Sequence, residues 1–367
     1  MSGSSVSFVI ANLFKKSKSN ILVITPTALK AEQALNDLVS LAGQDCVCYL
    51  PATQLKSSKS TINAVGPRNE RIDTILRLGS DVPTIVVSLP EVLSEPFPSQ
   101  NWVDDNTIEL IVGDLDEGNT REALLTKISR AGYQRESMVN AQGQFAVRGA
   151  LLDIYPFGHE FPVRLEYEDD EITSMRTFDP STQRSLYKTD TIKILLEEDD
   201  PQTESFLFDL LHEDTMIFWS GVEDISERVA KTVSSSKSQN LSEAIITDEA
   251  GSKHGELLAE LVNQAAAFRQ VMVNQLSNDI RDGLDFGCVL PDPFPAGLDE
   301  LAEYLKAYTE DGYKVWVSTD TTGERDRLDE LFFDSKLPNT IAITPMVSTG
   351  FVFKDEKIVV LTAHELF

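Results

Sequence analysis

Two arginines are the side chains in this chain whose type and spacing best suit chemistry. Arg148 lies just before Gly149, and Arg164 lies in the run PVRLEY. A guanidinium group is planar and always charged, so it can bind a carboxylate through two parallel hydrogen bonds. The chemistry expected here is recognition of an acidic group on a partner. The alternative is that each arginine pairs with Glu166 or Glu168 of its own chain, a contact worth about 0 to 1 kcal/mol.

Residues suited to catalysis are not found in a comparable arrangement. The histidines are scattered, and none has a serine or cysteine placed beside it as a nucleophile. Cys46, Cys48 and Cys288 lack the regular spacing of ligands that a metal site requires, so they are predicted to be buried strand thiols. We therefore expect no catalytic residue and no metal site in this segment.

A nucleotide site is not expected either. The first five residues, MSGSS, open a predicted helix, where a phosphate loop would lie, but the pattern GxxxxGK[ST] does not occur in the sequence. Without the lysine and the magnesium-binding hydroxyl of that loop, ATP hydrolysis loses its main charge stabilisers. The acidic run at residues 108–118 is interrupted by Gly113, and Asn119 with Glu122 is predicted to cap a following helix. ATP and Mg²⁺ are therefore not expected as cofactors of this segment.

A small antiparallel sheet must position the two arginines. Residues 144–186 contain short runs rich in Val, Ile, Leu, Phe and Tyr, which alternate with polar residues and are interrupted by glycine and proline. A strand is predicted at residues 163–167, an acidic turn after it, and a return strand at residues 172–178.

The period of two in a strand assigns these side chains to faces. Val163, Leu165 and Tyr167 should lie on one face and Arg164 on the other, together with Glu168. Arg164 is therefore predicted to point outward.

The same stretch resembles a known domain. The order FAVRGALLDIYP, then PVRLEYEDDEI, then a return strand ending in FDPSTQRS, is similar to the domain shared by the excision-repair protein UvrB and the bacterial transcription-repair coupling factors. In both families that domain is the docking surface for UvrA. The C-terminal segment VSTGFVFKDEKIVVLTAHELF and the missing phosphate loop favour the UvrB-like N-terminal region of the coupling factors over UvrB itself.

The resemblance also implies which residues contact UvrA. The contact positions of the family fall on the arginine of the V-R-G step, Arg148, on the arginine of the P-x-R-L step, Arg164, and on an aromatic residue four positions later. That last position is Glu168 in this chain, and the neighbouring Tyr167 belongs to the opposite face. An aromatic anchor can contribute about 2 kcal/mol or more at an interface. Its loss is expected to weaken UvrA binding, unless Glu168 matches a basic residue of the partner.

Composition agrees with a protein partner rather than with nucleic acid. The chain has 367 residues, of which 41% are hydrophobic, enough for several buried cores. With 59 acidic and 32 basic residues its formal charge is −27, so its surface as a whole repels a phosphate backbone. The sparse cysteines and the absence of a long apolar run predict a soluble, cytoplasmic protein that does not enter the membrane, and we expect a monomer.

The fold class predicted is α/β. Residues 1–109 and 197–287 are predicted to be two parts of a degenerate helicase-like domain with a parallel sheet. Residues 110–196 are predicted to be an inserted small β-rich domain that docks UvrA. Residues 288–367 are predicted to form a second small α/β domain, and residues 241–287 show no clear pattern.

The function expected from the resemblance is that of an adaptor without catalytic activity. It would recruit UvrA and the nucleotide excision repair machinery to RNA polymerase stalled at DNA damage. In the family, regions that bind RNA polymerase and double-stranded DNA, including an ATP-driven motor, follow this part of the chain. The alternative is a UvrB-type, ATP-dependent helicase subunit that recognises damage, which nucleotide binding by this chain would favour.

Overall fold

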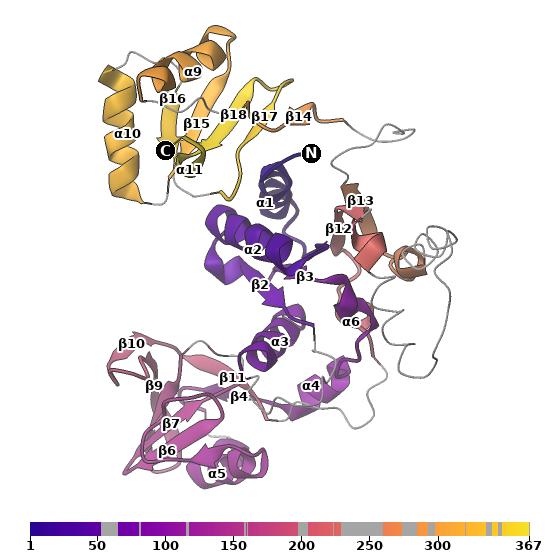
Figure 1. Cartoon of the computed structure of the whole chain (residues 1–367). Helices are drawn as coiled ribbons and strands as arrows, with labels where there is room; N and C mark the ends of the chain where they lie inside the picture. The colour runs from indigo at the N-terminus through magenta and orange to yellow at the C-terminus, as the bar shows by residue number, and fades with distance from the viewer. Residues whose placement is uncertain are drawn as a thin grey trace, which may run out of the picture. The chain divides into compact units, whose positions relative to one another are not determined.

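Figure 1 shows the computed structural model of the chain. It describes residues 1–52, 65–80, 82–114, 117–157, 159, 161–196, 205–222, 224–228, 260–273, 285–292, 298–319, 321–334, 340–343 and 347–366. The chain divides into two units. The first unit comprises residues 1–52, 83–93 and 212–367, and the second unit comprises residues 53–82 and 94–211.

A parallel sheet of five strands forms part of the first unit, with the order β13-β12-β1-β3-β2. Its central strand, β1 (Ile21–Ile24), consists of buried apolar side chains only. Such a run is typical of a parallel strand that is covered on both faces, as the sequence predicts. The other strands are β2 (Val47–Leu50), β3 (Ile85–Ser88), β12 (Met216–Ser220) and β13 (Arg269–Val273), and each pairing is parallel.

Two helices bury their apolar residues against this sheet. Helix α1 (Ser5–Ser17) contributes Ile10, and helix α2 (Ala28–Ala42) contributes Leu38, to one core with the strands. The hydroxyl of Thr27 accepts a hydrogen bond from the N–H of Lys30 and so caps the start of α2. Short 3₁₀ turns follow at η1 (Gln44–Cys46) and η2 (Pro90–Ser94).

The C-terminal part of the first unit is a second five-stranded sheet, with the order β14-β17-β18-β15-β16. Parallel strands β15, β16 and β18 are joined at one side by the antiparallel strands β17 and β14. The elements are β14 (Cys288–Val289), α9 (Leu298–Glu310), β15 (Lys314–Ser318), α10 (Thr322–Asp334), β16 (Thr340–Ile343), β17 (Phe351–Phe353), β18 (Ile358–Thr362) and α11 (Ala363–Leu366).

The second unit contains the predicted antiparallel sheet, which has six strands in the order β10-β9-β8-β7-β6-β5. All its pairings are antiparallel except that of β5 with β6. The strands are β5 (Gln134–Arg135), β6 (Gln144–Arg148), β7 (Leu151–Tyr155), β8 (Val163–Glu168), β9 (Glu171–Phe178) and β10 (Ser185–Lys188). Helix α5 (Arg121–Arg130) shares a core with one face of this sheet.

The second unit also holds a pair of strands, β4 (Thr107–Ile111) and β11 (Thr191–Leu195), which run antiparallel. The two segments that enter and leave the six-stranded sheet are thus held together. The remaining elements are α3 (Val65–Leu78), α4 (Gln100–Asn106), η3 (Glu117–Asn119) and α6 (Leu207–Leu210).

One predicted helix cap is wrong. Thr120, not Asn119, is the N-cap of α5, because its hydroxyl accepts a hydrogen bond from the N–H of Ala123. The side-chain amide of Asn119 instead donates to the carbonyl of Glu109 and to the carboxylate of Asp114. The described residues make up a mixed α/β chain with a parallel sheet of five strands, a mixed sheet of five strands, a sheet of six strands and a two-stranded pair. Among these residues no helix is long and apolar enough to span a membrane.

Candidate partner-docking site

One face of the six-stranded sheet is apolar, and the other, which we call the charged face, carries charged side chains beside a small buried cluster of Val139, Ala146 and Phe178. On β8, Val163, Leu165 and Tyr167 are buried in the core shared with α5. Arg164 and Glu166 alternate with them and lie on the opposite face. The assignment of side chains to faces that the sequence predicts is confirmed.

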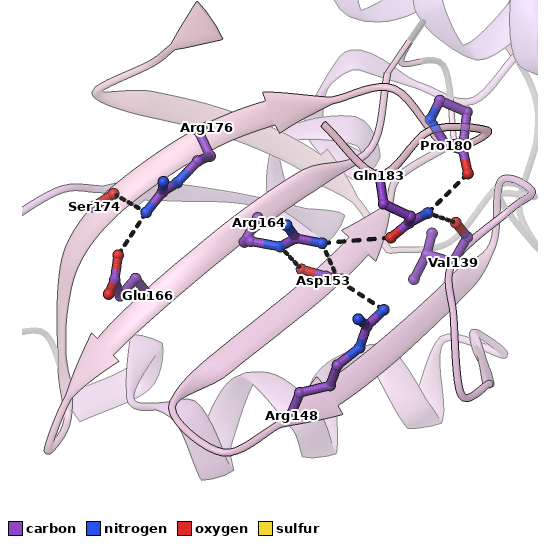
Figure 2. A network of polar contacts seen from close by, with 9 residues as sticks. All are labelled: Val139, Arg148, Asp153, Arg164, Glu166, Ser174, Arg176, Pro180 and Gln183. Atoms are coloured by element: carbon purple, nitrogen blue, oxygen red, sulfur yellow. Dashed lines mark hydrogen bonds and ion pairs between the residues drawn. The ribbon is translucent and has the colours of Figure 1, made fainter. Parts of the chain in front are cut away.

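Strand register brings three charged residues of this opposite face side by side. Asp153 of β7 pairs with Arg164 of β8, and Arg164 pairs with Arg176 of β9. The side chain of Asp153 is only 1% exposed. Its Oδ1 accepts from Nε of Arg164 at 2.6 Å and its Oδ2 accepts from Nη2 at 2.8 Å, as Figure 2 shows. This is a bidentate ion pair around a buried carboxylate.

The predicted exposure of Arg164 is therefore wrong, although its face is right. Its side chain is 15% exposed, and its guanidinium lies 4.5 Å from the centre of the Phe178 ring. Its hydrogen bonds with Asp153 raise the pKa of Arg164, against the opposing effect of burial. Alternation along one strand gives the face of a side chain but not its partner across the sheet. For that reason the sequence suggested Glu166 or Glu168, whereas the partner is Asp153.

Gln183, in the turn after β9, contacts the guanidinium of Arg164. The Oε1 atom of Gln183 lies 3.5 Å from Nη2 of Arg164. The amide nitrogen of Gln183 donates to the carbonyl oxygens of Val139 and Pro180, and Figure 2 shows how these contacts converge. Since Gln183 is itself fixed, Arg164 is held in a single orientation.

Arg148 is the more accessible of the two arginines. It is the last residue of β6, and its side chain is 43% exposed. One guanidinium nitrogen lies 3.4 Å from Oδ2 of Asp153 (Figure 2). Gly149, which follows it, has a φ of 57° and so supplies the left-handed backbone of the turn into β7. Arg148 thus has a charged anchor on one side and solvent on the other.

Arg176 was not predicted as a member of this site. It donates to Oε2 of Glu166 at 2.7 Å, and its side chain is 33% exposed. Its Nε atom is buried and has no hydrogen-bond partner within the described residues. The signal that could have revealed it is its position in the return strand, which the pairing of β8 with β9 places directly opposite Arg164.

Glu168 lies at the end of β8, where it pairs across the hairpin with Glu171 and is exposed. Within the described part of the chain, Glu168 forms no ion pair with Arg148 or Arg164, which both pair with Asp153. Tyr167 is buried on the core face, and burial raises its pKa to about 12. The prediction that the aromatic ring lies on the face opposite to Arg164 is confirmed.

Comparison with known proteins matches this part of the chain to a family. The family model named UvrB interaction domain covers residues 114–199, which include the whole charged network around Asp153. The chain resembles the UvrB-like N-terminal region of transcription-repair-coupling factors. The resemblance read from the sequence is thereby confirmed.

Three relatives named transcription-repair-coupling factor illustrate this similarity. The chain is 30% identical over 195 residues to the transcription-repair-coupling factor of Bacillus subtilis (strain 168), a match covering 53% of this chain and 16% of the relative. It is 39% identical over 114 residues to that of Escherichia coli (strain K12), covering 30% of this chain and 10% of the relative. It is 30% identical over 203 residues to that of Staphylococcus haemolyticus, covering 54% and 17%. The matched part is thus a small fraction of each relative.

Proposed function

We propose that the charged face of the six-stranded sheet binds UvrA, and that the chain recruits the nucleotide excision repair machinery to RNA polymerase stalled at DNA damage. The observation that carries this proposal is the pair of arginines held around Asp153 inside the UvrB interaction domain. Arg148 presents an exposed guanidinium, and Arg164 presents a fixed one. A fixed cation loses little conformational freedom when a carboxylate of a partner binds beside it.

The two arginines have different roles in this proposal. Arg148 has exposed donor groups left over after its single contact with Asp153, so it makes the direct ionic contact. Arg164 satisfies Asp153, which would otherwise pair with Arg148 in full, and thereby leaves Arg148 available to a partner. Glu168 lies at one end of the same face and meets a basic residue of UvrA.

Binding of purified UvrA to wild type, Arg148→Ala and Arg164→Ala, measured by pull-down and by isothermal titration calorimetry, tests this proposal. The matched control is Arg130→Ala, because Arg130 is an exposed arginine of α5, the helix that packs on the other face of the sheet. We expect the affinity for UvrA to fall about tenfold or more in each of the two site variants and to stay unchanged in the control. Equal binding by all four proteins would remove the assignment.

We further propose that the first unit is a degenerate relative of a helicase-like domain and hydrolyses no nucleotide. RNA polymerase and double-stranded DNA would then be bound by regions that follow this segment in the coupling factors, and ATP and Mg²⁺ would serve a motor there. The rival function is that of a UvrB-type helicase subunit. DNA-stimulated ATP hydrolysis by this chain would favour the helicase function and contradict the proposed adaptor function.

A further inference from the structure

The N-terminal end of α1 contacts a loop of the first unit that is far away in the sequence. The N–H of Ser4 donates to the carbonyl of Thr349 at 3.2 Å, and the N–H of Thr349 donates to the hydroxyl of Ser4 at 3.0 Å. Ser4 and Thr349 thus exchange two hydrogen bonds across a sequence separation of 345 residues. We call residues 347–350 the closing loop.

Helix α2 holds the closing loop from a second side. The N–H of Ser348 donates to Oδ1 of Asp37 at 2.6 Å, and the hydroxyl of Ser348 donates to the carbonyl of Gln33 at 3.4 Å. Asp37 is 3% exposed. Burial raises the pKa of Asp37, and hydrogen bonds from the hydroxyls of Ser4, Ser348 and Ser7 oppose that rise. The carboxylate therefore joins the first turn of α1 to the closing loop.

The closing loop is also fixed within the C-terminal sheet to which it belongs. The N–H of Val347 donates to the hydroxyl of Ser318 at 2.9 Å, and the N–H of Gly350 donates to Oε1 of Glu365 at 2.9 Å. The other carboxylate oxygen of Glu365 accepts from the N–H of Thr362. The loop is thus anchored at both ends before it meets α1, which makes it a preformed surface rather than a loose strap.

Close packing surrounds these hydrogen bonds. A Cβ atom placed on Gly3, whose φ is 56°, would collide with the carbonyl oxygen of Gly350. One turn further along α1, the ring of Phe8 lies 5.8 Å from that of Phe351 and 6.3 Å from that of Trp316. Phe8 packs in this way on the apolar cluster that contains Phe351 and Val347. No side chain larger than hydrogen fits at residue 3 while the loop is in place.

We propose that the closing loop is a built-in substitute for a ligand at the start of α1. The first N–H groups of a helix and its dipole favour an anion or a carbonyl oxygen at this position. Here the carbonyl of Thr349 accepts from the N–H of Ser4, the N-cap residue of α1, and the carboxylate of Asp37 is part of the same hydrogen-bonded group. The loop thereby locks the C-terminal sheet to α1 and α2, and the turn is closed to phosphate while the lock is intact.

Hydrogen exchange on the full chain of 367 residues tests the lock, with Gly3→Ala as the disrupting variant. The matched control is Gly312→Ala. Gly312 also has a positive φ, of 84°, but no atom of the described residues lies within 4 Å of the position that a Cβ would take there. We expect the amides of Ser4, Ser348 and Thr349 to exchange at least about tenfold faster in Gly3→Ala than in wild type. Amides of β1 and β12 should keep their protection in both variants.

Two results would overturn the proposal. Exchange at Ser348 and Thr349 that is equally fast in wild type, Gly3→Ala and Gly312→Ala would mean that no lock exists. Faster exchange at the closing loop of wild type on addition of ATP with Mg²⁺ would mean that nucleotide displaces the loop, so that the loop gates a working site instead of replacing its ligand. Unchanged exchange with nucleotide and faster exchange in Gly3→Ala alone would support the lock.

Discussion

Asp153 and Asp37 are both almost completely buried, and they differ in the groups that compensate for their burial. Asp153 faces the guanidinium groups of Arg164 and Arg148. Asp37 accepts hydrogen bonds from neutral groups, among them the N–H of Ser348. A buried carboxylate that faces cations holds charged side chains at a surface, whereas one that faces neutral donors holds a segment of backbone. The first arrangement suits binding of a partner, and the second suits a lock within the chain.

Removing Asp153 should have the largest effect on stability. Asp153→Ala leaves the guanidinium of Arg164 beside Phe178 without its carboxylate, and breaking a buried pair in this way costs about 3 to 5 kcal/mol. The free energy of unfolding from urea titrations measures the loss. A loss below about 1 kcal/mol would show that the pair behaves like a surface contact and would end the comparison with Asp37.

A double variant controls for the chemistry of that site. Asp153→Leu with Arg164→Leu removes both charges, and replacing a buried pair by apolar side chains is often close to neutral. We therefore expect the double variant to be more stable than Asp153→Ala. If the double variant is equally unstable, lost packing and not an unpaired charge causes the effect.

The two arginines around Asp153 should differ in how much each contributes to the free energy of unfolding. Arg164→Ala removes both bonds of the bidentate pair and should cost about 2 to 4 kcal/mol of unfolding free energy. Arg148→Ala removes a single contact of 3.4 Å at an exposed side chain and should cost less than about 1 kcal/mol. Thermal unfolding of both variants beside wild type would give the order, and equal losses would contradict the division between a positioning arginine and a contacting one.

This division could not be read from the sequence. The predicted strands 163–167 and 172–178, the turn between them and the face of Arg164 follow from alternation and turn residues. The structure confirms them, with each strand one residue longer at the turn. The partner of Arg164 depends on the register between β7 and β8, which a single strand does not encode. The same holds for Ser4 and Thr349, whose contact joins segments far apart in the chain. Strand β13 lies in the stretch 241–287, where the sequence showed no pattern. Its residues, RQVMV, are two polar residues followed by three apolar ones, so they do not show the alternation of a strand.

Asp37 should make the stability of the chain depend on pH. Because burial raises the pKa of Asp37 in the folded chain, the folded state binds this proton more tightly than the unfolded state does. Stability from this group therefore falls as the pH rises from the ordinary range of an aspartate through the raised value. Asp37→Asn removes that dependence but keeps an oxygen that can accept from the N–H of Ser348. Urea titrations across the acidic range should show the unfolding free energy of Asp37→Asn rising relative to that of wild type as the pH increases, and parallel curves would contradict the assignment.

The pair formed by Glu166 and Arg176 should have the smallest effect, and it sharpens the comparison from the opposite side. Both side chains are about a third exposed or more, so solvent screens their contact of 2.7 Å. Glu166→Ala should change the unfolding free energy by about 0 to 1 kcal/mol, and roughly 1 M salt should abolish the difference. In UvrA titrations the same variant leaves the guanidinium of Arg176, which lies opposite Arg164 on the charged face, with its 3.5 Å contact to the hydroxyl of Ser174 and no carboxylate contact. Under the proposed function we expect binding that is unchanged or tighter, because the face becomes more basic. If Glu166→Ala lowers the affinity for UvrA as much as Arg148→Ala does, UvrA contacts Glu166 directly. Arg148 and Arg164 would then not be the main contact.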